Sequence, residues 1–212
     1  MSGLVWSVNA GHGAAQDAAA DEAGWLKPRT LAEQLPQGRL IEITAHVRGG
    51  QMTTAVSCLA HAQRRGETSA WVQLQGGSLY PPDLAHNGVD LDALVIVQVP
   101  KRTGAQGLGK ATELLLRSGG FGFVVLDLVG VAMRHDLAFQ GRLLGLTREH
   151  NSTLLLLTPA NPHGSFGPLV SLCIEPSRVR LGPSRFLIRH HIRKDKLGLF
   201  SRTLADEPII EL

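Results

Sequence analysis

The chain has 212 residues, of which 43% are hydrophobic and 18% are charged, with two cysteines and a formal net charge of +3. This composition excludes an intrinsically disordered chain, and the length suffices for one domain with a sizeable core. The sequence holds no apolar run of about 18 residues, so it predicts no membrane-spanning helix, and residues 1–20 lack the basic start and apolar run of a secretory signal. We therefore expect a cytoplasmic protein in which Cys58 and Cys173 are buried, free thiols.

Strands and helices alternate along most of the chain. Residues 1–24 are rich in Ala and are interpreted as a flexible arm, followed by a single core domain over residues 25–202. The apolar periodicity predicts helices at residues 28–35, 53–65, 83–86, 105–118 and 135–150. It predicts strands at residues 40–44, 68–74, 94–99, 121–128 and 153–158. Such alternation is typical of a mostly parallel sheet with helices on both faces.

After residue 168 the pattern changes to strands without helices. Strands are predicted at residues 170–175, 178–181 and 186–194, and an acidic and apolar tail follows at 203–212. These terminal strands are expected to extend the sheet in antiparallel fashion. The predicted fold class is therefore α/β, with a mostly parallel sheet and antiparallel strands added at its C-terminal end.

Residues 38–54, GRLIEITAHVRGGQMTT, are typical of a strand, a tight glycine turn and a helix. A phosphate-binding loop, G-x-x-x-x-G-K-[ST], has this context, and its amides and lysine hold phosphate while its hydroxyl holds Mg²⁺. At the positions of that motif the chain has Ala45 for the first glycine, Gly50 for the second, Gln51 for the lysine and Met52 for the hydroxyl. A shift by one residue puts Met52 at the lysine position and Thr53 after it, so neither frame supplies a cation.

Basic residues concentrate near the C-terminal end. Residues 178–202 hold eight Lys or Arg residues and one acid. A basic segment beside a nearly neutral body favours an anionic partner such as nucleic acid, although a solvated basic hairpin explains the same pattern. The candidate DNA-binding residues are Arg178, Arg180, Arg185 and Arg189.

The order of these elements resembles the core of the RecA recombinase family from about residue 25 to residue 200. The resemblance is carried, in order along the chain, by LPQGRLIEI, TTAVSCLAHAQRRGETSAWV, NGVDLDALVIVQVP, GFGFVVLDLVG, NSTLLLLT and IRKDK. It implies a RecA-like core, with the nucleotide site at the defective loop described above.

The resemblance also shows which catalytic groups are replaced. The family places the acid that activates the attacking water at the position of Gln75, and an amide cannot accept that proton at neutral pH. Pro159 and Ala160 replace the polar residues that sense the terminal phosphate, while Asp127 keeps the place of the magnesium-associated acid. We therefore expect no ATPase activity and no ATP or Mg²⁺ as a cofactor.

Two lysines that the family offers to a neighbouring subunit are kept. Arg193, Lys194 and Lys196, in the segment RKDK, resemble the residues that reach into the nucleotide site of the next protomer. Solubility of a terminal strand explains the same lysines. Short, divergent chains of this kind resemble the ImuA (SulA-like) family, in which an accessory protein works with a Y-family polymerase-like, ImuB-like partner.

This resemblance implies a non-catalytic adaptor in bacterial translesion mutagenesis that binds RecA at the nucleoid. Two alternatives stay open: a weak DNA-dependent ATPase that uses Asp127, and a direct DNA-binding module that uses residues 178–202. The segment Lys196–Phe200 (KLGLF) also resembles a sliding-clamp-binding pentapeptide without its leading Gln. The nine histidines show no metal-ligand spacing, and adjacent His190 and His191 would point to opposite faces of a strand, so no metal site is expected.

Overall fold

The computed structural model describes residues 28–45, 49–131, 136–160, 165–180 and 186–200. The predicted arm at 1–24 and tail at 203–212 lie outside these residues, so the predicted division of the chain stays a prediction. Among the described residues, no helix is both long and apolar enough to cross a membrane.

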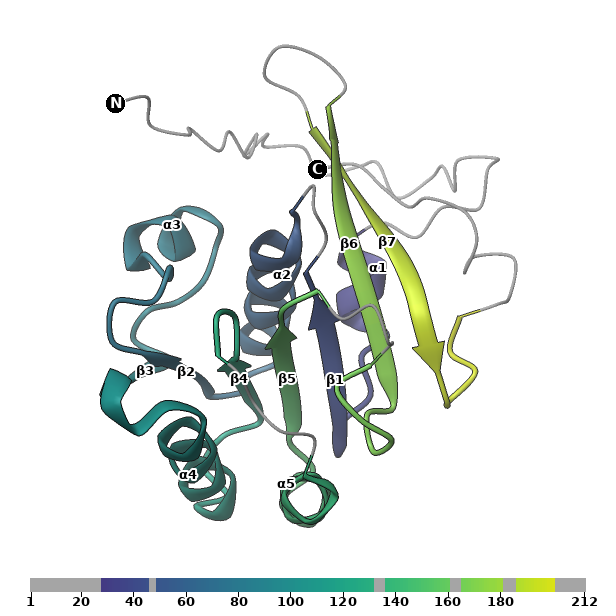
Figure 1. The fold of residues 1–212 in the computed structure, drawn as a ribbon. Helices are drawn as coiled ribbons and strands as arrows, with labels where there is room; N and C mark the ends of the chain where they lie inside the picture. Colours follow the sequence, from purple (N-terminus) through teal and green to yellow (C-terminus); the bar gives the residue numbers. More distant parts are fainter. Residues whose placement is uncertain (1–27, 46–48, 132–135, 161–164, 181–185, 201–212) are drawn as a thin grey trace.

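A seven-stranded sheet forms the centre of the molecule, in the order β3-β2-β4-β5-β1-β6-β7 (Figure 1). Its strands are β1 (Arg39–Thr44), β2 (Ser69–Leu74), β3 (Leu94–Val99), β4 (Phe123–Asp127), β5 (Thr153–Thr158), β6 (Leu172–Arg180) and β7 (Phe186–Asp195). Strands β1 to β6 run parallel, and β7 pairs antiparallel with β6. The predicted α/β class, with an antiparallel pair at the C-terminal end, is confirmed.

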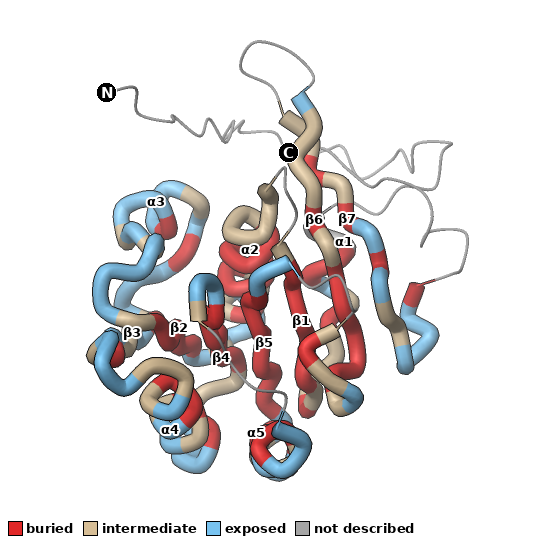
Figure 2. Tube along the Cα trace, in the orientation of Figure 1, coloured by how far each residue is buried: buried red, intermediate tan, exposed pale blue. Residues whose placement is uncertain are grey.

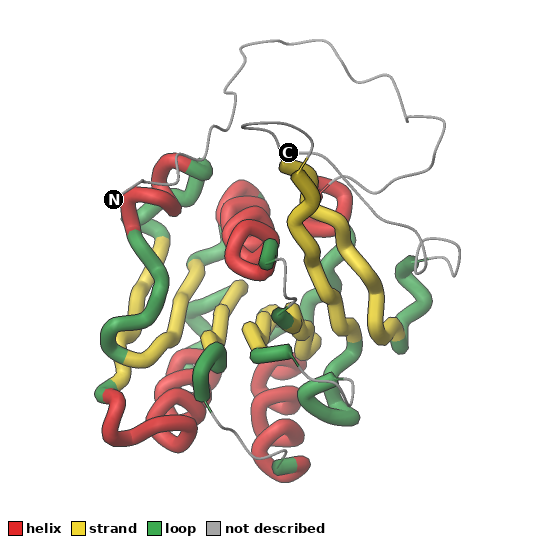
Figure 3. Tube along the Cα trace, turned by 45° about the horizontal axis from the view of Figure 1, so that its top comes forward, coloured by secondary structure: helices red, strands yellow, loops and turns green. Residues whose placement is uncertain are grey.

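Helices cover both faces of the sheet, as the alternating pattern predicts. They are α1 (Pro28–Glu33), α2 (Gln51–Arg64), α3 (Pro81–His86), α4 (Gly104–Arg117) and α5 (Leu137–Glu149), with a 3₁₀ turn at Lys101–Thr103. The core residues of α1 and α2 pack on one face, and those of α4 and α5 pack on the other. Figure 3 shows α4 and α5 side by side below the strands, with α2 on the other side.

The core is divided by the sheet into two apolar layers. Alternation along β1 puts Ile41 and Ile43 in the layer under α1 and α2, and Leu40 in the layer under α4 and α5. The apolar runs of β4 and β5 are buried on both faces, as predicted (Figure 2). Cys58 and Cys173 are buried, free thiols in opposite layers, which confirms the prediction made for them.

Strand β6 differs from the sequence-based prediction, which divided it in two. It runs without a break through Pro176, a residue that cannot donate a backbone hydrogen bond. Pairing between β1 and β6 ends at Ile43 and Ile174, so the missing N–H falls where β6 has left its inner neighbour. The β6–β7 hairpin consequently projects past the carboxyl ends of the parallel strands (Figure 1).

Candidate functional site

The residues of the predicted nucleotide site gather at the carboxyl edge of the sheet. Ala45 follows β1, and its N–H donates to the carbonyl of Thr158 at the end of β5 (2.9 Å). Gln75 follows β2, and Asp127 ends β4. Because these strands are parallel, all three residues lie at the edge where open α/β sheets bind ligands.

The glycine turn before α2 is closed by the β6–β7 hairpin. Gly49 and Gly50 have φ angles of 74° and 110°, a region that favours glycine. A Cβ at Gly50 would lie 3.4 Å from the Cβ of Pro176 and 3.5 Å from the Cδ1 of Ile188. The hairpin therefore packs directly on the turn that would hold phosphate in a working site.

Gln51, at the position of the phosphate lysine, is turned into the sheet. Its side-chain amide donates to the carbonyls of Ile43 (2.5 Å) and Thr158 (2.9 Å). Both hydrogen bonds of that NH₂ group are thus used to tie the start of α2 to the ends of β1 and β5. Met52, at the hydroxyl position, packs against the core under α1 and α2. Neither side chain offers charge or a metal ligand to the loop.

Thr54, two residues past Met52, is bound within the protein. Its hydroxyl lies 3.0 Å from the carbonyl of Gly50 and 2.9 Å from Nε2 of His190 in β7. Thr54 and His190 are each 2% exposed. If the Thr54 hydroxyl donates its hydrogen to Gly50, it accepts one from Nε2–H of His190. In that neutral tautomer the other ring nitrogen, Nδ1, is an acceptor, and it has no partner among the described residues.

Burial lowers the pKa of His190 to about 4, so the ring is neutral at physiological pH. Its neighbour His191 is exposed on the other face of β7, as alternation predicts. Within the described part of the chain, no three His, Cys, Asp or Glu side chains are grouped as a metal site. His190 thus has a structural partner, the Thr54 hydroxyl, which a sequence reading cannot supply.

Asp127 is the one acid of the predicted site. It is 6% exposed, and its Oδ1 accepts from the N–H of Val129 (2.9 Å). Burial raises the pKa of Asp127, and the Val129 hydrogen bond partly offsets that rise. No hydrogen bond among the described residues joins Asp127 to α2. Gln75 is exposed at the end of β2, at the same edge of the sheet.

A second acid, Glu42 in β1, was missed by the sequence analysis. It is fully buried, accepts from the Thr158 hydroxyl (2.7 Å) and accepts from the N–H of Phe166 (2.7 Å). It also lies close enough to Cys173 to raise the pKa of that thiol, after the larger effect of burial. The signal was present as a lone acid in the apolar run LIEIT. Glu42 fixes the chain that follows β5 onto the sheet.

Lys194 and Lys196 bind carbonyl groups of their own chain. The Lys194 ammonium donates to the carbonyl of Gly167 (2.8 Å) and approaches the hydroxyl of Ser165 (3.4 Å). The Lys196 ammonium donates to the carbonyl of Pro168. Partial burial, followed by the charge of Lys196, lowers the pKa of Lys194, while Glu42 opposes the shift.

These lysines lie away from the nucleotide edge of their own protomer. Lys194 is paired with Cys173 near the start of β6, whereas Pro176 and Ile188, which cover the glycine turn, lie farther along the hairpin toward its tip. Arg193, predicted to act with the lysines, instead forms an ion pair with Glu175 (3.1 Å). The structure therefore separates the RKDK segment from the site that Gln51 closes.

The turn after β7 is ordered by Asp195. Its carboxylate accepts from the N–H groups of Leu197, Gly198 and Phe200, each at 2.9 Å. Phe200 is 7% exposed and belongs to the core under α1 and α2. The aromatic anchor of the clamp-like segment is thus used inside the fold, which argues against the sliding-clamp interpretation.

The predicted arginine stripe is divided between two faces of the hairpin. Arg178 and Arg180 alternate on one face of β6, and the Arg178 guanidinium lies 4.8 Å from the centre of the Phe186 ring. Arg189 is paired with the residue before Arg178, so it lies on the opposite face. Arg185 lies outside the described residues. The described arginines do not form the single surface that the sequence suggested.

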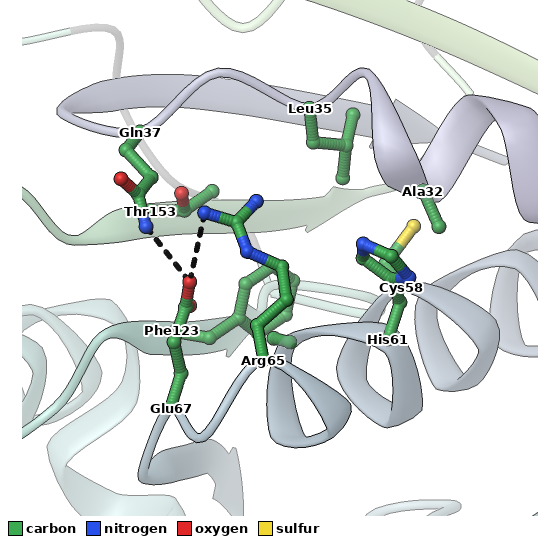
Figure 4. A pocket seen from close by; sticks show the side chains of 10 residues that line it. Ala32, Leu35, Gln37, Cys58, His61, Arg65, Glu67, Phe123 and Thr153 are labelled. Atoms are coloured by element: carbon green, nitrogen blue, oxygen red, sulfur yellow. Dashed lines mark hydrogen bonds and ion pairs between the residues drawn. The ribbon is translucent and has the colours of Figure 1, made fainter.

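A pocket at the opposite edge of the sheet is too small for a ligand. It lies at the start of β4 and β5. Glu67, in its lining, accepts a hydrogen bond from the side chain of Gln37 (2.8 Å) and forms an ion pair with Arg65 (3.5 Å) (Figure 4). Its volume is about 10 Å³, which holds one water molecule. The carboxyl edge therefore remains the candidate site.

Comparisons with known proteins agree with this architecture. The family model of the RecA N-terminal domain matches residues 30–143. The chain is 38% identical over 95 residues to the RecA protein of Clostridioides difficile (strain 630), an alignment that covers 45% of this chain and 26% of that protein. It is 38% identical over 94 residues to the RecA protein of Francisella tularensis subsp. novicida (strain U112), covering 44% and 25%. The chain thus spans about a quarter of the length of these relatives. On the match to more than half of its residues, the chain belongs to the RecA N-terminal domain family.

Proposed function

We propose that this protein is a non-catalytic RecA-like adaptor of bacterial DNA repair, which binds RecA and a Y-family polymerase-like partner in translesion mutagenesis. One observation carries the non-catalytic part. The side chain at the phosphate-lysine position, Gln51, is neutral and donates both amide hydrogens to the carbonyls of Ile43 and Thr158. The loop that would hold ATP is thereby tied to the sheet by its own side chain.

The other groups of a RecA-type site support the same proposal. The Thr54 hydroxyl at the start of α2 is held by Gly50 and His190, and Gln75 cannot act as a base. Loss of a single preorganised electrostatic group typically costs about 10²–10³ in rate. Asp127 alone does not replace the missing lysine, hydroxyl and base.

The adaptor role rests on the contrast between the two ends of the β6–β7 hairpin. Toward the tip of the hairpin, Pro176 and Ile188 cover the protein's own glycine turn. Near the end of β7, Lys194 and Lys196 donate to the carbonyls of Gly167 and Pro168. In a RecA filament, these lysines would exchange carbonyl partners for the phosphate oxygens of a neighbouring ATP, a charge-assisted contact. The defective site would not accept a further protomer in the same way, so the protein would cap the filament.

A second surface supports binding to another protein. Strand β3 is at the edge of the sheet, carries the uncharged sequence LVIVQV, and leaves Val95 43% exposed. Among the described residues its outer backbone groups face no neighbouring strand. An uncharged, apolar edge of this kind accepts a strand from a partner chain.

The experiment that tests the non-catalytic proposal is titration of the protein with Mg·ATP in a calorimeter, with RecA as the positive control. We expect no saturable binding at millimolar nucleotide, because the residue at the phosphate-lysine position, Gln51, is neutral and its amide is engaged by the sheet. The contrasting variant is Asp127→Asn, which removes the one acid at the edge. Tight binding by the wild-type protein that Asp127→Asn abolishes would show an ATPase-type site and refute the proposal.

A further inference from the structure

A second, larger groove lies between α4 and α5, on the face of the sheet away from α2. Its volume is about 920 Å³, and it is lined by the first turns of α4, the 3₁₀ turn before it and the start of α5. The two helices lie side by side in both Figure 1 and Figure 3. No residue of the nucleotide edge lines this groove.

Among the described residues of its lining, the groove has three cations: Arg102, Lys110 and Arg142. All three are exposed, and none forms an ion pair with another described residue. The Arg142 guanidinium lies 5.8 Å from the centre of the Phe139 ring, which restricts where that guanidinium points. The groove therefore presents positive charge from both of its walls.

The two acids in the lining are already engaged. Glu113 is paired with Arg117, one turn along α4 (2.5 Å). Asp136 caps α5 and accepts from the N–H of Ala138 (2.9 Å). Neither acid is paired with Arg102, Lys110 or Arg142, and three cations against two acids leave the described lining with a net positive charge.

A nucleotide cradle is excluded by the local backbone. The sequence GAQGLGK at residues 104–110 matches the G-x-x-x-x-G-K part of the phosphate-binding-loop motif. These residues form the start of helix α4, so the amides past its first turn donate within the helix instead of pointing at a phosphate. Gly107 is required by packing, because a Cβ there would lie 2.8 Å from Cγ1 of Val99.

Single-stranded nucleic acid also fits the lining poorly. Phe139 is the one aromatic residue among the described residues of the groove and is 8% exposed, which leaves little of its ring for a base to stack on. On the same two helices, the side chains of Leu114 and Leu137 are 54% and 57% exposed. These leucines suit a ligand in which apolar residues stand next to acidic ones.

We propose that the α4–α5 groove binds an acidic peptide segment of a protein partner. Its carboxylates pair with Arg102, Lys110 and Arg142, and its apolar side chains lie toward the exposed leucines of α4 and α5. Among the described residues that line this docking site, none belongs to the RKDK segment, so a partner here does not compete with a contact made through Lys194 and Lys196.

The test is fluorescence anisotropy of the full-length protein with a fluorescein-labelled decapeptide of alternating Glu and Leu pairs. The double variant Arg102→Glu/Arg142→Glu is expected to weaken binding at least about tenfold, because two cations become repulsive. The matched control, Arg64→Glu/Arg148→Glu, makes the same change of net charge at exposed arginines outside the groove and is expected to bind as the wild type does.

Two further arms decide between ligand classes. The same peptide with Gln in place of each Glu is expected to lose most of the affinity, and an oligothymidylate is expected not to displace the acidic peptide. The proposal is overturned if both double variants weaken binding equally. It is also overturned if the oligothymidylate binds more tightly than the peptide through Arg102 and Arg142, a result that would make the groove a nucleic-acid site.

Discussion

Replacing Glu42 by alanine is expected to lower the free energy of unfolding by about 3–5 kcal/mol. The carboxylate is fully buried and accepts hydrogen bonds from the Thr158 hydroxyl and the Phe166 N–H, both at 2.7 Å. Its removal leaves two buried donors without acceptors and opens a cavity between β1 and the chain that follows β5. Urea unfolding followed by circular dichroism measures the loss.

Two control variants separate this contact from general effects of substitution. Glu42→Gln keeps one oxygen acceptor, so it is expected to cost about 1–2 kcal/mol. Glu113→Ala removes an ion pair to the exposed guanidinium of Arg117, for which a loss within about 0.5 kcal/mol is expected. Equal losses for Glu42→Ala and Glu113→Ala would mean that Glu42 does not hold the chain after β5.

Acidification is expected to destabilise the fold through His190. Burial lowers the pKa of this ring to about 4 from a usual value of 6.5, so the unfolded chain binds the proton more readily than the folded protein. Stability therefore falls as the pH drops through 6.5, and the fall ends near pH 4. Relative to neutral pH, the titration of His190 lowers the free energy of unfolding by about 2 kcal/mol at pH 5 and by about 3 kcal/mol at pH 4.

The measurement is the free energy of unfolding in urea from pH 7.5 to pH 4. His190→Asn removes the titrating ring, so the difference in stability between wild type and variant should shrink steadily over that interval. His191→Ala, at the exposed neighbouring position, should run parallel to the wild type. A wild-type curve that keeps the same distance from His190→Asn at every pH would contradict a buried neutral ring.

Periodicity in the sequence was sufficient to predict the helices and the parallel strands β1 to β5. The bounds of β3 and β5 agree with the predicted residues 94–99 and 153–158, because each strand is an apolar run between turn residues. The helix predicted to end at residue 65 is α2, and Gly66, with φ of 81°, follows its end as a glycine that terminates a helix. Local signals of this kind need no knowledge of distant residues.

The hydrogen bonds made by the residues of the candidate site could not be predicted, because they join segments that are distant in the sequence. The sequence shows that Gln51 replaces a lysine, but not that its amide reaches Thr158 in another strand. Glu42 and Phe166 are likewise brought together only by the sheet order. The break predicted at Pro176 failed because proline is tolerated where β6 has already left β1.

The adaptor account is tested most directly by ATP hydrolysis by RecA on single-stranded DNA, titrated with this protein, beside an arm without RecA. We expect RecA turnover to fall at substoichiometric protein, with no hydrolysis in the arm that lacks RecA. Lys194→Ala/Lys196→Ala, checked for folding by circular dichroism, is expected to lose that inhibition. Hydrolysis in the arm without RecA, with RecA turnover unchanged by the protein, would contradict the account and identify the chain as an enzyme.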